Sequence, residues 1–149
     1  MKPLAVNKFA GHSYEILETF EAGMVLLGQE VKSIRTGRVG LRGAYVVFKE
    51  EEAFLIGANI PPYQPNNTPV DYSPDRSRKL LLQKKEIKYL LGKSRQKGLT
   101  MVPLKLYSKA GKIKLEFALV KGLREIDKRE KIKKRETERE IRRTLNEKS

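Results

Sequence analysis

Alternation of apolar and polar residues gives the clearest structural signal in this chain. Residues alternate over 104–107 and again over 113–119, and Gly111 lies in the segment between them. Successive side chains of a β-strand point to opposite faces, so this pattern predicts a hairpin with one face in the core. The other face of the hairpin is partly basic.

Four further strands are predicted in the first half of the chain. They are expected at residues 14–20, 22–28, 44–49 and 53–58. An acidic turn at Glu21 would separate the first two strands, and Glu50–Glu52 would join the second two. Short runs of β-branched and aromatic residues bounded by glycine and charged residues are typical of strands.

Two helices are predicted from apolar residues spaced three and four apart. Residues 30–36 would form the first, ending at Gly37, and residues 84–97 the second, ending at Gly98. Prolines in residues 59–78 exclude a helix there and predict a long loop. About six short strands, with a helix between the fourth and the fifth, predict a mainly β fold. The expected architecture is a small antiparallel β-barrel, closed or partly open, with two or three helices.

The last 29 residues, 121–149, differ in character from the rest. Twelve are Lys or Arg and seven are Asp or Glu, so this segment carries +5 of the total net charge of +14. Its few apolar residues form no continuous helical stripe. On a helix, six basic residues would share an arc of roughly 80°. They are Arg124, Lys128, Lys131, Arg135, Arg139 and Arg142. This favours a tail that becomes helical when its basic face meets phosphates; a solvated charged tail is the alternative.

Length and charge together predict one basic domain, residues 1–122, followed by a basic tail, residues 123–149. A pI near 10.0 indicates a polyanionic partner, nucleic acid before an anionic membrane surface. The chain has no apolar run of about 18 residues, and its first residues lack the apolar core of a signal peptide. Without cysteine, disulfides and zinc–thiolate sites are excluded, and a reducing cytosol fits.

The sequence contains no arrangement of residues that is typical of a catalytic site. His12 is the only histidine, so histidine-dependent catalysis or metal binding would depend on this one residue. Glu15 and Glu18 would face opposite sides of their strand. Neither a phosphate-binding loop nor a dinucleotide-binding fingerprint is present. We therefore expect no enzyme activity, no metal and no cofactor.

Two basic clusters are candidate phosphate sites. Lys32 and Arg35 share one face of the first predicted helix. Arg38 and Arg42 follow this helix.

The second cluster contains Arg76, Arg78 and Lys79. On an extended segment Arg76 and Arg78 point the same way, and each guanidinium can hold a phosphate through two hydrogen bonds. Tyr63 and Tyr72 precede them, where an aromatic ring could stack on an unpaired base or pack against the barrel.

Several segments, in order along the chain, resemble the SmpB family of SsrA-binding proteins. They are N-K-x-A-x-H-x-Y at residues 7–14, E-A-G-x-x-L-x-G-x-E-V-K-S-I-R at 21–35, P-Y at 62–63, P-x-R-x-R-K-L-L-L at 74–82, G-x-T-x-V-P-L-x-L-Y at 98–107, K-G at 121–122 and D-K-R-E at 127–130. Each segment alone is a weak signal. Together they are strongly specific, and they cover nearly the whole chain.

The resemblance implies an oligonucleotide-binding fold, no catalytic activity and a role in trans-translation. A protein of this family binds the tRNA-like domain of tmRNA and helps to deliver it to stalled ribosomes. Its tail would become helical in the decoding centre and the empty mRNA channel, against small-subunit rRNA. We therefore expect a cytoplasmic, ribosome-associated monomer with no membrane partner.

Carried over by position, the resemblance assigns residues to two surfaces. The tmRNA face would contain Asn7, Lys8, His12, Glu21, Lys32, Arg35, Tyr63, Arg76, Arg78 and Lys79. The ribosome-binding tail would contain Gly122, Arg124, Asp127, Lys128, Arg129, Lys131, Arg135, Arg139 and Arg142. The tail departs from the family pattern at Leu123, where lysine is frequent, and at Ile126, where histidine is frequent.

Two other classes of protein remain as alternatives. A structural ribosomal protein would also have an RNA-binding barrel and a basic tail, but it would bind rRNA permanently. An RNA-processing nuclease would need carboxylates to hold Mg²⁺, and the sequence offers no evident cluster of them.

Overall fold

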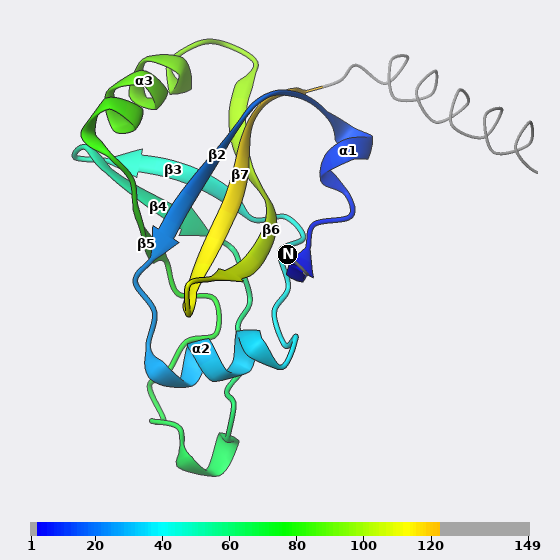
Figure 1. The fold of residues 1–149 in the computed structure, drawn as a ribbon, viewed down its shortest axis with the longest axis vertical. Coiled ribbons are helices and arrows are strands. Elements are labelled where there is room, and N and C mark those ends of the chain that lie inside the picture. The colour runs from blue at the N-terminus through cyan, green and yellow to red at the C-terminus, as the bar shows by residue number, and fades with distance from the viewer. Residues whose placement is uncertain (1–2, 123–149) are drawn as a thin grey trace, which may run out of the picture.

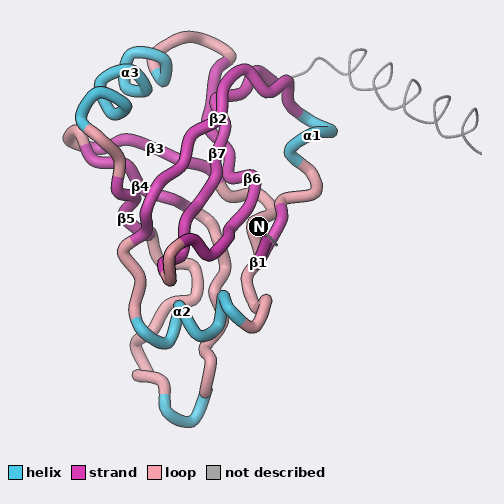
Figure 2. The backbone as a smooth tube through the Cα atoms, in the orientation of Figure 1, coloured by secondary structure: helices cyan, strands magenta, loops and turns pink. Residues whose placement is uncertain are grey.

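The computed structural model describes residues 3–122, and one antiparallel sheet of seven strands forms its framework (Figure 1, Figure 2). In chain order the elements are β1 (Pro3–Val6), α1 (Ala10–Ser13), β2 (Tyr14–Met24), α2 (Gly28–Arg35), β3 (Tyr45–Lys49), β4 (Glu52–Ile56), a 3-10 turn (Pro65–Asn67), β5 (Arg78–Leu81), α3 (Lys84–Ser94), β6 (Leu99–Lys109) and β7 (Lys112–Gly122). The strands lie in the spatial order β1-β6-β7-β2-β5-β4-β3.

The sheet curls into a partly open barrel. Its edge strand β3 comes close to β6, but within residues 3–122 no ladder joins these two strands. The other edge strand, β1, pairs with residues 105–107 of β6, so the first residues of β6 border the opening. The mainly β, oligonucleotide-binding type of barrel predicted from the sequence is thereby confirmed.

The hairpin predicted from alternation is confirmed and proves longer than expected. β6 begins at Leu99, and β7 continues to Gly122. Ala110 and Gly111 form the turn with φ of 51° and 77°, the backbone conformation that two-residue hairpin turns require. The alternating residues Ile113, Leu115, Phe117 and Leu119 of β7 are all buried.

The predicted acidic turn at Glu21 is wrong, because residues 14–24 form one continuous strand, β2. Glu21 pairs with Glu116 inside the β2–β7 ladder. Gly23 lies inside this strand and pairs with Leu81 of β5.

The helices agree with the sequence in position but not in length. α2 covers residues 28–35 and is followed by the C-cap Thr36 and by Gly37, whose φ of 80° suits glycine. α3 ends at Ser94, earlier than predicted, and Gly98 instead lies in the turn before β6. β1, α1 and β5 were not predicted from the sequence, and the proline-rich loop contains a short 3-10 turn where no helix was expected.

The core fills the barrel and is closed by the two longer helices. Leu55, Leu106 and Phe117 come from three strands and are fully buried. Ile34 of α2 and Leu90 of α3 are also fully buried and belong to the same cluster. Figure 1 shows these helices at opposite ends of the barrel, so each covers one opening.

Candidate nucleic-acid interface

The helix α2 presents two basic side chains at one end of the barrel. Lys32 and Arg35 are exposed, while Ile34 between them is buried. The Lys32 Nζ lies 5.9 Å from the centre of the Tyr63 ring, and the Arg35 Nη2 donates a hydrogen bond of 3.0 Å to the Gly111 carbonyl. Of the residues assigned to the tmRNA face, Lys32 and Tyr63 are therefore brought together, and Arg35 lies on the same helix, beside the β6–β7 turn.

Beneath this surface lies a buried carboxylate that the sequence analysis did not single out. Glu30 accepts hydrogen bonds from the Arg78 Nε and Nη2 at 3.0 and 2.7 Å, and from the Arg76 Nε at 3.1 Å. The Tyr72 hydroxyl donates to the same carboxylate at 3.1 Å. Burial raises the pKa of Glu30, but hydrogen bonds from Arg76, the Leu27 amide and Arg78 outweigh it, so the pKa lies below its ordinary value.

This network corrects the expectation for Arg78. Its side chain is fully buried, and its remaining donors bind the carbonyls of Ala58 and Pro74 at 2.7 and 2.8 Å. Arg76 and Arg78 do point to the same side, as predicted, but the group they share is Glu30. The physical reason is that a phosphate cannot reach a guanidinium in the interior, whereas a buried carboxylate can neutralise it. We infer that Arg78 holds the fold together beneath the surface.

Lys79 lies on the other face of β5. Strand alternation buries Arg78 and Leu80 and exposes Lys79. The Lys79 Nζ forms an ion pair of 3.2 Å with Glu52, and both side chains are about half exposed. The predicted cluster of Arg76, Arg78 and Lys79 is therefore divided between the interior and the surface.

A second group of assigned residues surrounds α1. The Asn7 Nδ2 donates to the Pro103 carbonyl at 2.9 Å, and the Asn7 Oδ1 accepts from the Phe9 amide at 3.3 Å. These bonds fix the chain where β1 turns into α1. Lys8 and His12 on either side of this corner are exposed.

Glu21 is exposed on β2 and is surrounded by donors. The Tyr107 hydroxyl donates to it at 2.6 Å, and the Lys109 Nζ lies 3.3 Å from both carboxylate oxygens. The hydrogen bond from Tyr107, followed by the nearby lysines, lowers the pKa of Glu21, while burial and the bond to Glu21 raise that of Tyr107. Glu21 thus orients basic and hydroxyl groups on this face.

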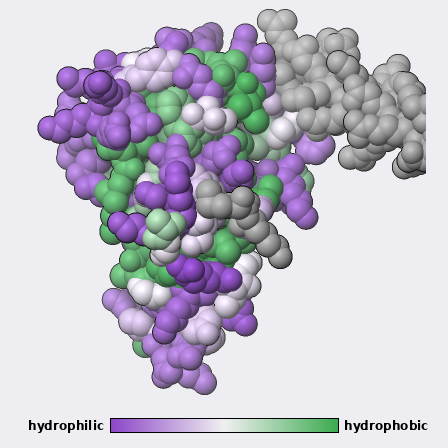
Figure 3. Space-filling model, in the orientation of Figure 1, coloured by the Kyte–Doolittle hydropathy of each residue, from purple (hydrophilic) through white to green (hydrophobic). Residues whose placement is uncertain are grey.

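Of the assigned residues, Lys32, Arg35 and Tyr63 lie at or beside α2, and Asn7, Lys8 and His12 lie around α1, whereas Glu21 and Lys79 lie on the strands β2 and β5. In Figure 1, α2 crosses below the barrel and α1 lies at its upper right. β1 connects them, because it packs near α2 and leads into α1. In Figure 3, hydrophilic residues gather over α3 and over the loop beyond α2.

Most residues assigned to the ribosome-binding tail lie outside the residues that the structure describes. Gly122 is the last described residue, is exposed and pairs with Tyr14, so the tail begins beside α1. The other assigned tail residues lie beyond it: Arg124, Asp127, Lys128, Arg129, Lys131, Arg135, Arg139 and Arg142.

Among residues 3–122, no group of three or more His, Asp or Glu could hold a metal ion. No helix in the same range is long and apolar enough to cross a membrane.

The described residues define a basic, partly open barrel of the oligonucleotide-binding type. The chain matches the family model described as SmpB protein over residues 4–147, and it belongs to the SmpB family.

Individual relatives agree with this assignment. The SsrA-binding protein of Persephonella marina is 50% identical over 141 residues, which cover 95% of this chain and 92% of the relative. That of Symbiobacterium thermophilum is 50% identical over 146 residues, which cover 97% of this chain and 92% of the relative. A chain in the solved structure "tmRNA-SmpB: a journey to the center of the bacterial ribosome" is 44% identical. It superposes with a TM-score of 0.69 over 88% of this chain and 95% of its own length.

Proposed function

We propose that this protein binds the tRNA-like domain of tmRNA through its barrel and delivers it to stalled ribosomes for trans-translation. The observation that carries the proposal is the family match over residues 4–147, which includes both the barrel and the tail. The similar chain in the tmRNA-SmpB structure supports the same partners. The protein would act by binding alone, without catalysis.

The charges of the barrel support an RNA partner. Residues 3–122 contain 20 Lys or Arg and 11 Asp or Glu. The basic residues at α2 and around α1 offer phosphate contacts along one path, with β1 between them. Such contacts supply most of the affinity for nucleic acid and make it sensitive to salt.

The position at which the tail begins supports separate binding roles for the barrel and the tail. β7 runs from Lys112, next to the turn that Arg35 contacts, to Gly122 beside α1. Eleven extended residues span about 30 Å. The basic surface at α2 is therefore far from the start of the tail. We infer that the barrel holds tmRNA, while residues 123–149 enter the decoding centre and the mRNA channel of the small subunit.

Charge reversal at α2 tests the barrel part of the proposal. In K32E and R35E, affinity for a transcript of the tmRNA tRNA-like domain is expected to fall about 10- to 100-fold, as lost charge-assisted bonds predict. The slope of log affinity against log salt should become shallower by about one per lost phosphate contact. Fluorescence anisotropy over a salt series measures both quantities.

The matched control is K88E, which makes the same change of charge on the exposed side of α3. It should bind the transcript nearly as the wild type does. Equal loss in K32E and K88E would assign the effect to net charge alone and would contradict a binding surface at α2. Circular dichroism establishes that each variant is folded.

A proline in the tail tests whether that segment acts as a helix. T137P leaves every charge in place but removes a backbone donor, and it would destabilise a helix by about 3 kcal/mol. We expect peptide tagging on stalled ribosomes in a reconstituted system to fall sharply, while binding to tmRNA stays near the wild-type value. Normal tagging by T137P would contradict a helical tail and favour an extended polycation. T137A is the control.

A further inference from the structure

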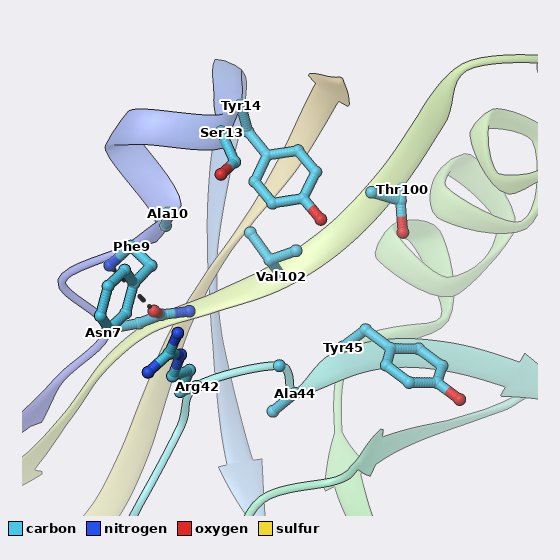
Figure 4. Close-up of a pocket in the computed structure, with 11 residues that line it drawn as sticks. Asn7, Phe9, Ala10, Ser13, Tyr14, Arg42, Ala44, Tyr45, Thr100 and Val102 are labelled. Carbon is cyan, nitrogen blue, oxygen red and sulfur yellow. Dashed lines mark hydrogen bonds between the residues drawn. The ribbon is translucent and has the colours of Figure 1, made fainter. Parts of the chain in front are cut away.

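A cavity of about 420 Å³ opens near the gap between β3 and β6, in the seam where the barrel is not closed (Figure 4). Its lining comes from the β1–α1 corner, from the segment before β3 and from the first residues of β6. The volume lies in the range of pockets that hold small organic groups. Its position, between two strands that never pair, makes the cavity a consequence of the open barrel.

The floor of this cavity is apolar and its rim is aromatic. Ala10, Ala44 and Val102 are almost fully buried and form the floor. Phe9 and Tyr45 are 49% and 43% exposed, so much of each ring is accessible to solvent. Figure 4 shows the Tyr14 ring above Val102, between these two positions. Three rings therefore surround one recess.

A positively charged side chain, that of Arg42, lies at the rim of the cavity. The Arg42 guanidinium carbon lies 4.4 Å from the centre of the Phe9 ring, a stacking distance for arginine on an aromatic face. Phe9 is itself held by the hydrogen bond from its amide to the Asn7 Oδ1, and Asn7 is bound to the Pro103 carbonyl of β6. The backbone at Phe9 is thus tied to β6 through Asn7, and the rim of the pocket combines flat aromatic faces with positive charge.

These features together favour a nucleobase as the ligand of the cavity. A purely apolar ligand would not need the guanidinium, and a phosphate alone would not need three rings and an apolar floor. An unpaired base has π faces that stack on aromatic side chains, and its 5′ or 3′ phosphate can meet a cation at the rim. We propose that the seam pocket, defined by Phe9, Tyr14, Arg42, Tyr45 and Val102, receives one unpaired base of the bound RNA. The inference rests on the proposed function, because it names a base-binding subsite on the RNA-binding barrel.

Alanine substitution of the two exposed rings tests the proposal. F9A and Y45A are each expected to weaken binding to the tRNA-like domain transcript about 5- to 100-fold, the range of a lost stacked base. The salt dependence should stay at the wild-type slope, because no phosphate contact is removed. A series of transcripts with 2-aminopurine at single unpaired positions provides the second readout. One position should be quenched on binding to the wild type and not on binding to F9A or Y45A.

Matched variants show whether weaker binding results from lost base stacking or from a disturbed fold. Y89A removes a ring that is 41% exposed on α3, outside the pocket, and should bind with wild-type affinity and normal quenching. F9Y keeps an aromatic face and should retain binding. F9L keeps apolar contact without a π face and should behave like F9A. Because Phe9 and Tyr45 are about half exposed, the variants at these two positions should keep a melting temperature close to that of the wild type.

The outcomes distinguish this inference from the proposed function. If the wild type binds the transcript and the pocket variants bind equally well with unchanged quenching, the base pocket is overturned while the proposed function stands. A loss accompanied by a shallower salt slope would make the pocket a phosphate site and would also overturn the inference. If the wild type itself does not bind the transcript, the proposed function fails and the subsite fails with it.

Discussion

Replacing Glu30 by alanine is expected to destabilise the barrel by about 3–5 kcal/mol, because it leaves a buried guanidinium without its counter-charge. Arg78 is fully buried, and two of its nitrogens bind Glu30. The other acceptors of Arg78 are the carbonyls of Ala58 and Pro74 and the Tyr72 hydroxyl, and none of them carries a full negative charge. Urea denaturation followed by circular dichroism measures the free energy of unfolding.

The control is E52A, which removes the partner of Lys79 in an exposed ion pair. Exposed pairs contribute about 0–1 kcal/mol, so E52A should unfold close to the wild type. The double variant E30M/R78M, which replaces the buried pair with apolar side chains, should recover much of the loss from E30A. Equal stability of E30A and E52A would contradict the role assigned to the Glu30 network.

The same network predicts a pH dependence of stability. The pKa of Glu30 is lowered in the folded state from its ordinary value of 4.5. Its contribution is therefore fully present above about pH 4.5 and is lost as the pH falls through the folded-state value. Melting temperatures of the wild type should drop below that pH, and those of a folded E30Q should drop less. A parallel decline in both proteins would assign the acid sensitivity to other carboxylates, such as Glu21.

Removing residues 123–149 is expected to abolish ribosome rescue while leaving the barrel folded. The deleted segment contributes no coherent apolar face to a core, and the buried residues of the barrel lie within residues 10–120. Affinity for tmRNA should fall only modestly, because the surface at α2 remains. The measurements are circular dichroism, binding to the tRNA-like domain and peptide tagging on stalled ribosomes.

The truncated protein tests whether the tail acts on the ribosome or contributes to the binding of tmRNA. If the tail acts on the ribosome, the truncated protein should bind tmRNA and compete with the wild type for it, yet support no tagging. Loss of tmRNA binding in a folded truncated protein would contradict the division of labour between barrel and tail. The boundary at Gly122 leaves β7 complete, so its pairing with β2 is preserved.

The sequence predicted those parts of the fold that local periodicity determines. Apolar and polar residues alternate over residues 104–107 and 113–119 of the β6–β7 hairpin, and α2 and α3 carry apolar residues at helical spacing. The type and position of these elements could therefore be predicted, but not the register shift between Pro103 and Lys105. β1 and β5 have only four residues each and lie at places where tertiary pairing, not local pattern, stabilises a strand. The acidic residue Glu21 resembles a turn signal in isolation, but its pairing with Glu116, far away in the sequence, keeps it inside a strand.

The buried network was partly predictable and the seam pocket was not. Glu30 lies three and four residues before Ser33 and Ile34, so helical periodicity places it on the buried face, where a carboxylate needs a partner. That signal predicts a basic partner for Glu30, but it does not identify which of the basic residues is the partner. Phe9 and Tyr45 are 36 positions apart, and nothing in the local sequence indicates that they border one cavity. Only the open seam of the barrel brings them together.

Sequencing the RNA that co-purifies with the tagged protein tests the central claim most directly. Cells that express the affinity-tagged chain are lysed, the protein is recovered at physiological salt, and the bound RNA is sequenced. K32E/R35E serves as the matched control, since it should keep the fold and lose RNA. Our account predicts that tmRNA is the dominant small RNA bound to the wild type and is depleted from the double variant. Stoichiometric ribosomal RNA without enrichment of tmRNA would instead identify a structural ribosomal protein and contradict the account.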